Sequence, residues 1–466
     1  MKNLMIMIIL LVGFVLVACN TATEKSTKTQ DTLALEHQKV VPEWSRNSVI
    51  YEVNIRHYTP EGTFNAFAAH IPRLKELGID ILWIMPIHPV GLKNRKMTEK
   101  SLGSPYSVQD YLKVNPDYGT MDDFKALVKL AHDNGMKVII DWVANHTSWD
   151  NVWVTSNPEF YTKNDKGEMT VPAGTDWEDT ADLNYDNDSL RSAMTEAFKF
   201  WIKETDIDGY RCDVAGMVPV DFWDNVRAEL DKIKPVFMLA EAEEAPLHKN
   251  AFDMAYAWNF HNLMKQVAQA KADVSVLDTY FAQIDTAFPE GTYMMNFITN
   301  HDENAWTGTI KESFGAVANT MAVLSFTAPG MPLIYTGQEV GLAKRLSFFE
   351  KDLVKWDVKN TETELYKNLI KLKRQNPALD AGTFGGKLVR INTSNDKAVF
   401  AFIRQKDENK VVVVLNLSKK AEKFTLTGET FAGKYTDFFA NQDSELKANQ
   451  EFNIPAWGYN VFVSKK

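Results

Sequence analysis

Cysteine is scarce in this chain, with 2 residues among 466. Cys19 lies near the N-terminus and Cys212 lies in the middle of the sequence. At most one intrachain disulfide is possible, and none can form if Cys19 is modified. Stability must then come from a buried core, and the composition provides for one, because 45% of the residues are hydrophobic and 12% are aromatic.

Positive charge is also in deficit. The 51 Lys and Arg residues are outnumbered by 61 Asp and Glu residues, which gives a formal net charge of -10. The sequence has no basic patch or basic tail, so nucleic acid is not expected as a partner. The net charge is consistent with a soluble surface, and it does not exclude a neutral substrate.

The one strongly apolar segment is the N-terminus, MKNLMIMIILLVGFVLVACN. The run is short and small residues precede Cys19, which predicts a secretion signal rather than a spanning helix. Its Leu-Val-Ala-Cys ending resembles a bacterial lipobox, and a plain signal or an uncleaved anchor is the alternative. We expect residues 1–18 to be a lipoprotein signal peptide and residues 19–42 a flexible tether. Lipid on Cys19 would hold the exported protein on a bacterial membrane, at the outer membrane or cell surface.

Strand and helix patterns alternate from about residue 48. Eight apolar runs are expected as strands: SVIYEVNI, IDILWIMPI, KVIIDWVANH, GYRCDV, PVFMLAE, FDMAYAWN, YMMNFITN and MPLIYTGQE. Eight such units predict an α/β fold, a closed (β/α)8 TIM barrel over residues 43–375. An open doubly wound sheet is the alternative, but no glycine-rich phosphate loop follows the first strand.

Two helices illustrate the pattern. Residues 63–78 are expected to form one helix that ends at Gly78, because Phe64, Phe67, Ile71, Leu74 and Leu77 recur at helical spacing. The next helix is expected to start with a capping box of Thr120 and Asp123 and to end at Gly135. Its buried stripe is expected to be Phe124, Leu127, Val128 and Ala131.

The alternation lapses twice. Residues 147–188, which are rich in Asp, Asn, Gly and aromatics, are expected to form an inserted subdomain with a functional role. After about residue 376 the sequence holds short strand runs separated by turns, namely KLVRIN, KAVFAFIRQ, KVVVVLNLS, KFTLTG and YNVFVS. They predict a C-terminal antiparallel β-sandwich over residues 376–466.

Polar residues fall where the barrel strands end, which is the rim that carries chemistry in this architecture. They are Asp141, Asn145, His146, Arg211, Asp213, Glu241, Asn300, His301 and Asp302. Alternation along the fourth strand turns Arg211 and Asp213 into the barrel mouth.

These carboxylates suit retaining glycoside hydrolysis, which needs a carboxylate nucleophile and a carboxylic acid across the scissile bond. Arg211 should keep Asp213 ionised. Two negative neighbours should push Glu241 toward its protonated form, and Asp302 can stabilise the charge developing on the sugar.

Four motifs, in order, resemble those of the α-amylase family, glycoside hydrolase family 13. They are DWVANH, GYRCD, LAE and FITNHD, with ADLNYD and SPYSVQDY similar to two further family segments. The resemblance covers about residues 48–376 and implies cleavage of α-1,4-glucosidic bonds in starch, maltodextrin or related polysaccharides, with retention. It also implies that Asp213 is the nucleophile, Glu241 the acid/base and Asp302 the transition-state stabiliser. Substrate-binding residues implied by the same motifs are Tyr106, His146, Arg211 and His301.

Other residues near the motifs have plainer interpretations. Asn145 and Asp141 are expected to hold the rim together, and Glu243 and Glu244 to be solvated loop charges. Aromatic rings suit sugar faces, so stacking roles are open for Trp177, Trp258 and Phe297, although Phe297 fits the core equally well.

The sequence departs from the family after the nucleophile. Many α-amylases have a Lys-His pair there, which contacts the leaving group and frames a calcium site, whereas this chain reads Val214-Ala215-Gly216-Met217. Calcium therefore stays open, with Asn145 as the weak candidate ligand, and no organic cofactor is expected. Acidic residues of the insertion that could complete such a calcium site are Asp150, Asp176, Asp179 and Asp182.

Alternative functions stay open. The same three carboxylates serve a neopullulanase-type, α-1,6-active hydrolase or a glucanotransferase. A non-catalytic glucan-binding protein is a third possibility, because fold does not fix function. A membrane anchor would also suit an enzyme that works beside a glucan uptake system.

Overall fold

The computed structural model describes residues 39–96, 98–356 and 360–465. The predicted signal peptide, Cys19 and most of the predicted tether lie outside the described residues. Within the described ranges, no helix has the length and apolar character needed to span a bilayer.

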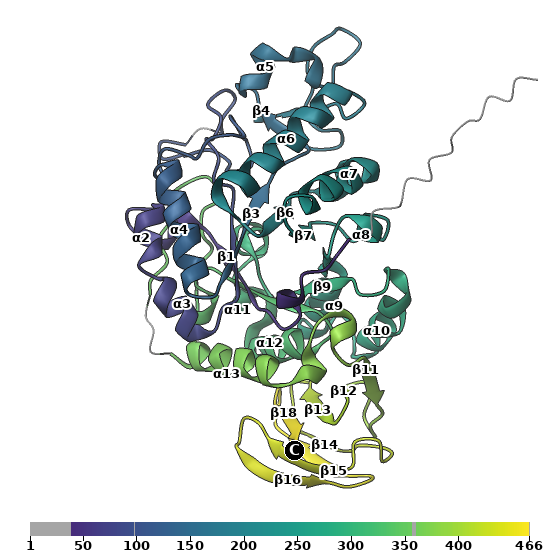
Figure 1. The fold of residues 1–466 in the computed structure, drawn as a ribbon. Coiled ribbons are helices and arrows are strands. Elements are labelled where there is room, and N and C mark those ends of the chain that lie inside the picture. The colour runs from purple at the N-terminus through teal and green to yellow at the C-terminus, as the bar shows by residue number, and fades with distance from the viewer. Residues whose placement is uncertain (1–38, 97, 357–359, 466) are drawn as a thin grey trace, which may run out of the picture. The chain divides into compact units, whose positions relative to one another are not determined.

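All eight predicted strand runs form one closed parallel barrel (Figure 1), in the order β1-β10-β9-β8-β7-β6-β3-β2. The predicted TIM barrel is therefore confirmed. The strands are β1 (Ile50–Val53), β2 (Ile81–Ile84), β3 (Lys137–Trp142), β6 (Gly209–Cys212), β7 (Phe237–Ala240), β8 (Met254–Tyr256), β9 (Tyr293–Asn296) and β10 (Met331–Tyr335).

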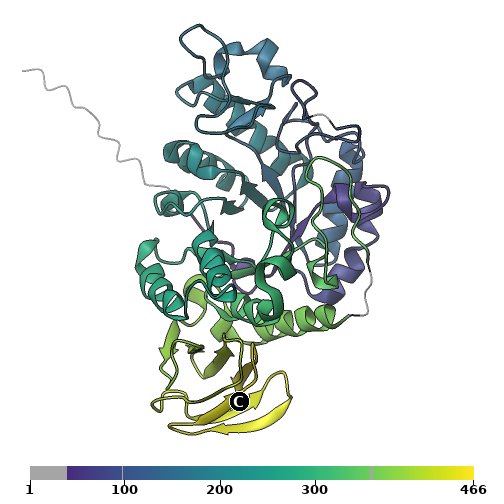
Figure 2. The same ribbon diagram turned by 180° about the vertical axis from the view of Figure 1, so that it is seen from behind.

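Helices follow the strands and cover the outside of the barrel (Figures 1 and 2). The longer ones are α4 (Met121–Asp133), α6 (Asp188–Thr205), α7 (Val220–Asp231), α9 (Trp258–Ala268), α10 (Ser275–Ala287), α12 (Ala318–Thr327) and α13 (Thr361–Gln375). The shorter ones are α1 (Ile55–Tyr58), α2 (Phe64–Ala68), α3 (Ile71–Leu77), α8 (Leu247–Asn250) and α11 (Ile310–Phe314).

The single helix predicted over residues 63–78 is wrong, because the segment forms two helices, α2 and α3. Pro72 explains the break: proline has no N–H to donate, so it fits the first turn of a helix and not its interior. The predicted end at Gly78 is confirmed, since Gly78 adopts φ 102° and donates its N–H to the carbonyl of Leu74.

The predictions for α4 are confirmed. Thr120 and Asp123 form the reciprocal capping box, and the expected stripe of Phe124, Leu127, Val128 and Ala131 is buried. Gly135 follows the helix end with φ 73°.

The core has two layers, which follow from strand alternation. One set of side chains fills the barrel interior, including Ile50, Ile81, Ile139, Phe237 and Met254. The alternate set, such as Leu82, Val138 and Tyr210, packs between the barrel and its helices.

The segment after β3 forms a small antiparallel pair, β4 (His146–Ser148) with β5 (Thr180–Asp182), together with helix α5 (Val152–Ser156). It lies at the top of Figure 1, next to α6.

The C-terminal region is an antiparallel sheet domain (yellow in Figure 2). Its six-stranded sheet comprises β11 (Leu388–Ile391), β12 (Val399–Lys406), β13 (Asn409–Asn416), β18 (Tyr459–Ser464), β15 (Gly433–Asp437) and β16 (Gln442–Leu446). A second, two-stranded sheet pairs β14 (Glu422–Thr425) with β17 (Glu451–Ile454). Sequence reasoning missed β15, β16 and β17, because short polar strands lack an apolar pattern.

Arg404 of β12 connects this domain to the barrel. Its side chain is buried and donates hydrogen bonds to the carbonyls of Thr327 and Ala328 at the end of α12, at 3.2 and 3.1 Å. It also donates to the carbonyls of Gly386 and Asp380 in the connecting segment, both at 2.8 Å. Buried carbonyls at a helix end need such donors, so this one guanidinium serves both domains.

Candidate active site

The barrel interior becomes polar at the carboxyl ends of its strands. Below this level the inward-facing residues are apolar. Because parallel strands end at one rim, the polar groups form a single layer there. Its charged members are Glu52, Asp141, Arg211, Asp213 and Glu241.

Arg211 is wholly buried at the centre of this layer. Its Nη1 donates to Oδ1 of Asp141 and to Oδ1 of Asp213, both at 2.8 Å. Its Nη2 forms an ion pair with Oε2 of Glu241 at 2.9 Å, and its Nε donates to Oη of Tyr256 at 3.1 Å. One guanidinium thus holds three carboxylates in place, which is how a buried charge is tolerated.

Three carboxylates around one cation cannot all ionise readily. Burial raises the pKa of Asp213 to about 6 and that of Glu241 to about 7, while Arg211 acts in the opposite direction on both. The expectation that Arg211 keeps Asp213 ionised is correct in direction, but burial outweighs it. For Glu241, burial is a larger cause than the negative neighbours that we expected to dominate.

The backbone after Asp213 reaches the side chain of Glu241. The N–H of Val214 donates to Oε2 of Glu241 at 2.9 Å, the same oxygen that contacts Arg211. Val214 adopts φ 38°, a left-handed conformation that β-branched residues rarely take. Because two donors occupy Oε2, a proton on Glu241 belongs on Oε1.

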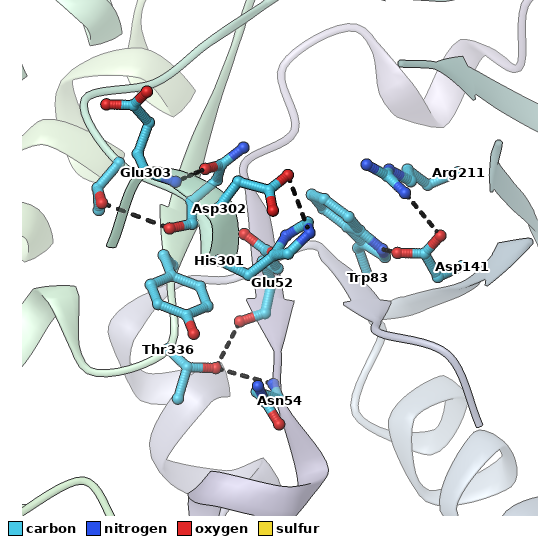
Figure 3. A network of polar contacts seen from close by, with 12 residues as sticks. Glu52, Asn54, Trp83, Asp141, Arg211, His301, Asp302, Glu303 and Thr336 are labelled. Atoms are coloured by element: carbon cyan, nitrogen blue, oxygen red, sulfur yellow. Dashed lines mark hydrogen bonds and ion pairs between the residues drawn. The ribbon is translucent and has the colours of Figure 1, made fainter. Parts of the chain in front are cut away.

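His301 and Asp302 approach from the rim after β9. Oη of Tyr106 lies 2.8 Å from Nε2 of His301 and donates to Oδ2 of Asp141 at 3.0 Å. Asp302 is about one-third exposed, and its Oδ2 lies 3.3 Å from Nε2 of His301. Figure 3 shows Asp302 beside His301. It also shows Asp141 between two donors: Arg211, which bonds Oδ1, and Trp83, which bonds Oδ2.

His146 approaches from the opposite side, at the start of β4. It is buried, and burial lowers its pKa to about 4. Its ring centroid lies 5.2 Å from that of Trp177, which belongs to the insertion. The insertion therefore contributes Trp177 to the surroundings of His146.

These groups surround a cleft of about 430 Å³. Six of the residues predicted from sequence line it, namely Tyr106, His146, Asp213, Glu241, His301 and Asp302. Arg211 lies beneath the cleft, wholly buried, and contacts its carboxylates from below. A pocket of this size with a few convergent polar groups is typical of a small-molecule or oligosaccharide site.

Sequence reasoning missed an aromatic wall of the cleft, formed by Trp306, Phe348 and Phe349. The ring centroids of Trp306 and Phe348 are 5.0 Å apart, and Trp306 is 56% exposed. Phe348 stacks on Tyr106 at 6.1 Å. These residues come from loops after β9 and β10, where no periodicity marks them.

Glu52 was also missed, although a signal existed. It is a charged residue inside an apolar strand run, as Arg211 is. It is wholly buried, and its Oε1 lies 2.5 Å from Nδ1 of His301.

The positions of four further residues decide what was expected of them. Phe297 is wholly buried in the barrel interior, and Trp258 packs edge-to-face on it at 5.0 Å, so neither lines the cleft. Trp177 does line it. Glu243 is not a solvated loop charge, because its carboxylate accepts the N–H of Asn259 at 3.0 Å in the first turn of α9.

The side chains considered for calcium lie around the inserted segment after β3. Among the described residues, no group of three or more His, Cys, Asp or Glu side chains is placed to hold a metal ion. The amide of Asn145 contacts Nδ1 of His146 at 3.3 Å, and Asp150 accepts hydrogen bonds from Leu92 and Gln109. Oδ1 of Asp150 and Oδ2 of Asp179 are buried without a hydrogen-bond partner among the described residues, so calcium stays an expectation, and no chemical step below involves a metal.

Comparison with protein families finds two matches. The family described as "Alpha amylase, catalytic domain" matches residues 24–170 and 174–380. The family described as "Alpha-amylase SusG C-terminal domain" matches residues 399–458.

Individual relatives extend this result. A solved α-amylase from Lactobacillus plantarum is 31% identical with a TM-score of 0.80, covering 91% of this chain and 100% of that one. A solved maltogenic α-amylase from Thermotoga neapolitana is 27% identical with a TM-score of 0.82, covering 90% of this chain and 99% of that one. The α-amylase MalA of Haloarcula japonica is 27% identical over 442 residues, which are 89% of this chain and 63% of that protein. The chain therefore spans less than two thirds of the Haloarcula protein.

Proposed function

The chain belongs to the α-amylase family of glycoside hydrolases, and on that basis we propose that it is a retaining hydrolase of α-1,4-glucosidic bonds in starch, maltodextrin or related α-glucans. The observation that carries the proposal is the placement of Asp213 and Glu241 on two nitrogens of one buried guanidinium, at the floor of the cleft. Asp302 lines the same cleft.

In the first half of the reaction, a carboxylate oxygen of Asp213 attacks the anomeric carbon. The bond from that carbon to the glycosidic oxygen breaks, and Glu241 gives its proton to the departing oxygen. The raised pKa of Glu241, about 7, keeps a proton available near neutral pH. Oε1 is the oxygen that carries it, because Oε2 is already held by Val214 and Arg211.

In the second half, a water molecule attacks the anomeric carbon of the glycosyl-enzyme ester. Glu241, now ionised, takes a proton from the water, and Asp213 leaves as a carboxylate. Two inversions at one carbon restore its configuration. Asp302 stabilises the positive charge that develops on the sugar in both transition states.

The sugar that precedes the cut is bound by Tyr106, His146 and His301, which line the cleft. Arg211 acts from beneath by fixing the two reacting carboxylates. Aromatic rings face the cleft from two sides, with Trp177 on the insertion and Trp306 after β9. Flat rings suit the C–H faces of glucose units, which supports a chain of several units as substrate.

The test compares wild type and Asp213→Ala on soluble starch, pullulan and an isomaltose-type substrate. Mixed maltooligosaccharides released from starch by the wild type alone would support the proposal. Panose from pullulan would move the assignment to a neopullulanase type. Longer products formed from maltoheptaose would indicate a glucanotransferase.

The same experiment tests the non-catalytic alternative. Glucan binding by the wild type without release from any substrate would overturn the enzyme assignment and leave a binding protein.

We also propose that lipid on Cys19 attaches the protein to a bacterial membrane, where it could supply a glucan uptake system. The support is the lipobox-like ending of the N-terminal segment, which lies outside the described residues. Membrane fractionation of wild type and Cys19→Ser tests this, and equal release of both into the soluble fraction would overturn it. Calcium binding is tested by comparing thermal melting in CaCl2 and in chelator.

A further inference from the structure

Glu52 occupies an unusual place for a carboxylate. Strand alternation turns it inward above Ile50, at the level of Trp83 on β2 and Tyr335 on β10. Its side chain is wholly buried. Burying a carboxylate is costly unless it has a partner, so its surroundings must explain it.

The surroundings fix both the backbone and the side chain of Glu52. Its carbonyl accepts hydrogen bonds from Oγ1 and the N–H of Thr336, at 2.6 and 3.0 Å (Figure 3). Its Oε1 lies 2.5 Å from Nδ1 of His301, and its Oε2 has no hydrogen-bond partner among the described residues. His301 is therefore the one side chain shown to bond this carboxylate.

A directed chain of hydrogen bonds determines the protons on His301. The hydroxyl of Tyr106 donates to Asp141, so the same hydroxyl must accept at its 2.8 Å contact with Nε2 of His301. Nε2 therefore carries a proton. Nδ1 faces a carboxylate oxygen at 2.5 Å, which also requires a proton between the two atoms.

The charged groups around His301 decide where that second proton lies. They come from several elements: Glu52 on β1, Asp302 beside it, Arg211 on β6, Asp141 on β3, and the phenols of Tyr106 and Tyr335. Burial is the largest influence and opposes a positive charge on His301, as Arg211 also does, whereas the contacting carboxylates of Asp302 and Glu52 favour that charge and outweigh both. The outcome is a His301 pKa raised to about 9.

We propose that Glu52 is a positioning residue that holds His301 as an imidazolium, with both ring N–H groups committed as donors. Nδ1–H points down to Glu52, and Nε2–H points toward Tyr106, Asp302 and the cleft. The inference extends the proposed function, because it gives the cleft a fixed positive charge beside Asp302.

Two consequences follow for the site. A cationic His301 places a fixed positive charge 3.3 Å from Oδ2 of Asp302, at the edge of the cleft. With a proton on each ring nitrogen, His301 has no acceptor to offer a sugar hydroxyl, so a hydroxyl that approaches it cannot donate to the ring.

The experiment is an NMR titration of the histidine side chains, carried out on the wild-type protein and on the Glu52→Gln variant. His301→Gln assigns the signal of His301 among the 9 histidines. In the wild type, both ring nitrogens of His301 should stay protonated to about pH 9. Glutamine keeps the shape and can still accept from Nδ1–H, but it lacks the charge, so the proton affinity of His301 should fall by roughly 100-fold.

The matched control is Glu339→Gln. Glu339 is also wholly buried but is paired with Arg73 at 2.8 Å and does not touch His301. It should leave the His301 titration unchanged. If it lowers the proton affinity as much as Glu52→Gln does, the effect is general loosening and the proposal fails.

Two further results would overturn the proposal. One is an unchanged His301 titration in a folded Glu52→Gln protein. The other needs no variant: a His301 that is neutral at pH 7 in the wild type, with the shared proton on Glu52. Because NMR titration requires no turnover, these outcomes are independent of whether the protein hydrolyses glucan.

Discussion

The backbone N–H of Val214 donates to Oε2 of Glu241 at 2.9 Å, so the residue that follows the proposed nucleophile is bonded to the proposed acid. The two reacting groups therefore cannot move independently. Arg211 reinforces the connection from below. This is the type of support that keeps a reacting pair within the narrow geometry that catalysis requires.

Replacement of Glu241 by Gln should lower kcat/KM on maltooligosaccharides by roughly 10²- to 10⁴-fold, because the departing oxygen loses its proton donor. A maltosyl fluoride should suffer much less, since fluoride leaves without a proton. Glu243→Gln is the control, because the Glu243 carboxylate accepts the N–H of Asn259 and does not line the cleft. Equal losses on both substrates would argue against an acid role for Glu241.

The activity should have a narrow pH optimum. Turnover needs Asp213 ionised, which its pKa of about 6 allows above that pH, and Glu241 protonated, which its pKa of about 7 allows below that pH. We expect kcat/KM to peak between these values and to fall on both sides. Initial rates from about pH 4 to about pH 9 measure this, and a flat profile across that range would contradict the assignment.

Trp306→Ala should weaken binding of long substrates. If stacking contributes about 1 kcal/mol, KM for maltoheptaose should rise roughly fivefold while kcat changes little. A short substrate that does not reach the aromatic wall should be nearly unaffected. A comparison of maltoheptaose with maltotriose measures this, and an equal change on both would show that Trp306 does not bind the distal sugars.

His88 makes stability depend on pH. Tyr111, Trp142 and Trp201 surround its ring, and burial lowers its pKa from 6.5 to about 3. Between these values the unfolded chain binds a proton at this residue and the folded protein does not. The free energy of unfolding therefore falls as pH drops through this window, by about 1.4 kcal/mol per unit.

His88→Phe removes that dependence and keeps an aromatic ring in the space. Urea unfolding at several pH values should show a slope smaller by about one proton than in the wild type. An unchanged slope would mean that the folded protein already protonates His88.

Much of the fold was predictable because barrel strands are apolar runs at regular intervals. The same regularity placed Asp213 and Glu241, which follow directly on β6 and β7, and Asp302, which lies six residues after β9. The polar strands β15–β17 have no such pattern, and the break between α2 and α3 depended on one proline. Local signals of that size are easily outweighed by a longer apolar stripe.

The site was less predictable from the sequence where tertiary contacts determine which residues meet. Nothing in the sequence shows that Trp306 lies against Phe348, because each belongs to a separate loop. Burial also altered the electrostatics that we inferred from neighbours alone, and it dominates the pKa of both Asp213 and Glu241. Glu52 could have been found by alternation, since it lies two residues after an inward-facing Ile50.

The hydrogen bonds of Arg404 affect how the protein unfolds on heating. Its guanidinium satisfies carbonyls at the end of a barrel helix and in the segment that leads to the sheet domain. Detaching the sheet would strand those carbonyls and an arginine without partners, so neither domain can be lost first at low cost. The two domains should therefore unfold as one cooperative unit and give a single calorimetric transition. Proteolytic cleavage between them should also lower the thermal stability of the barrel.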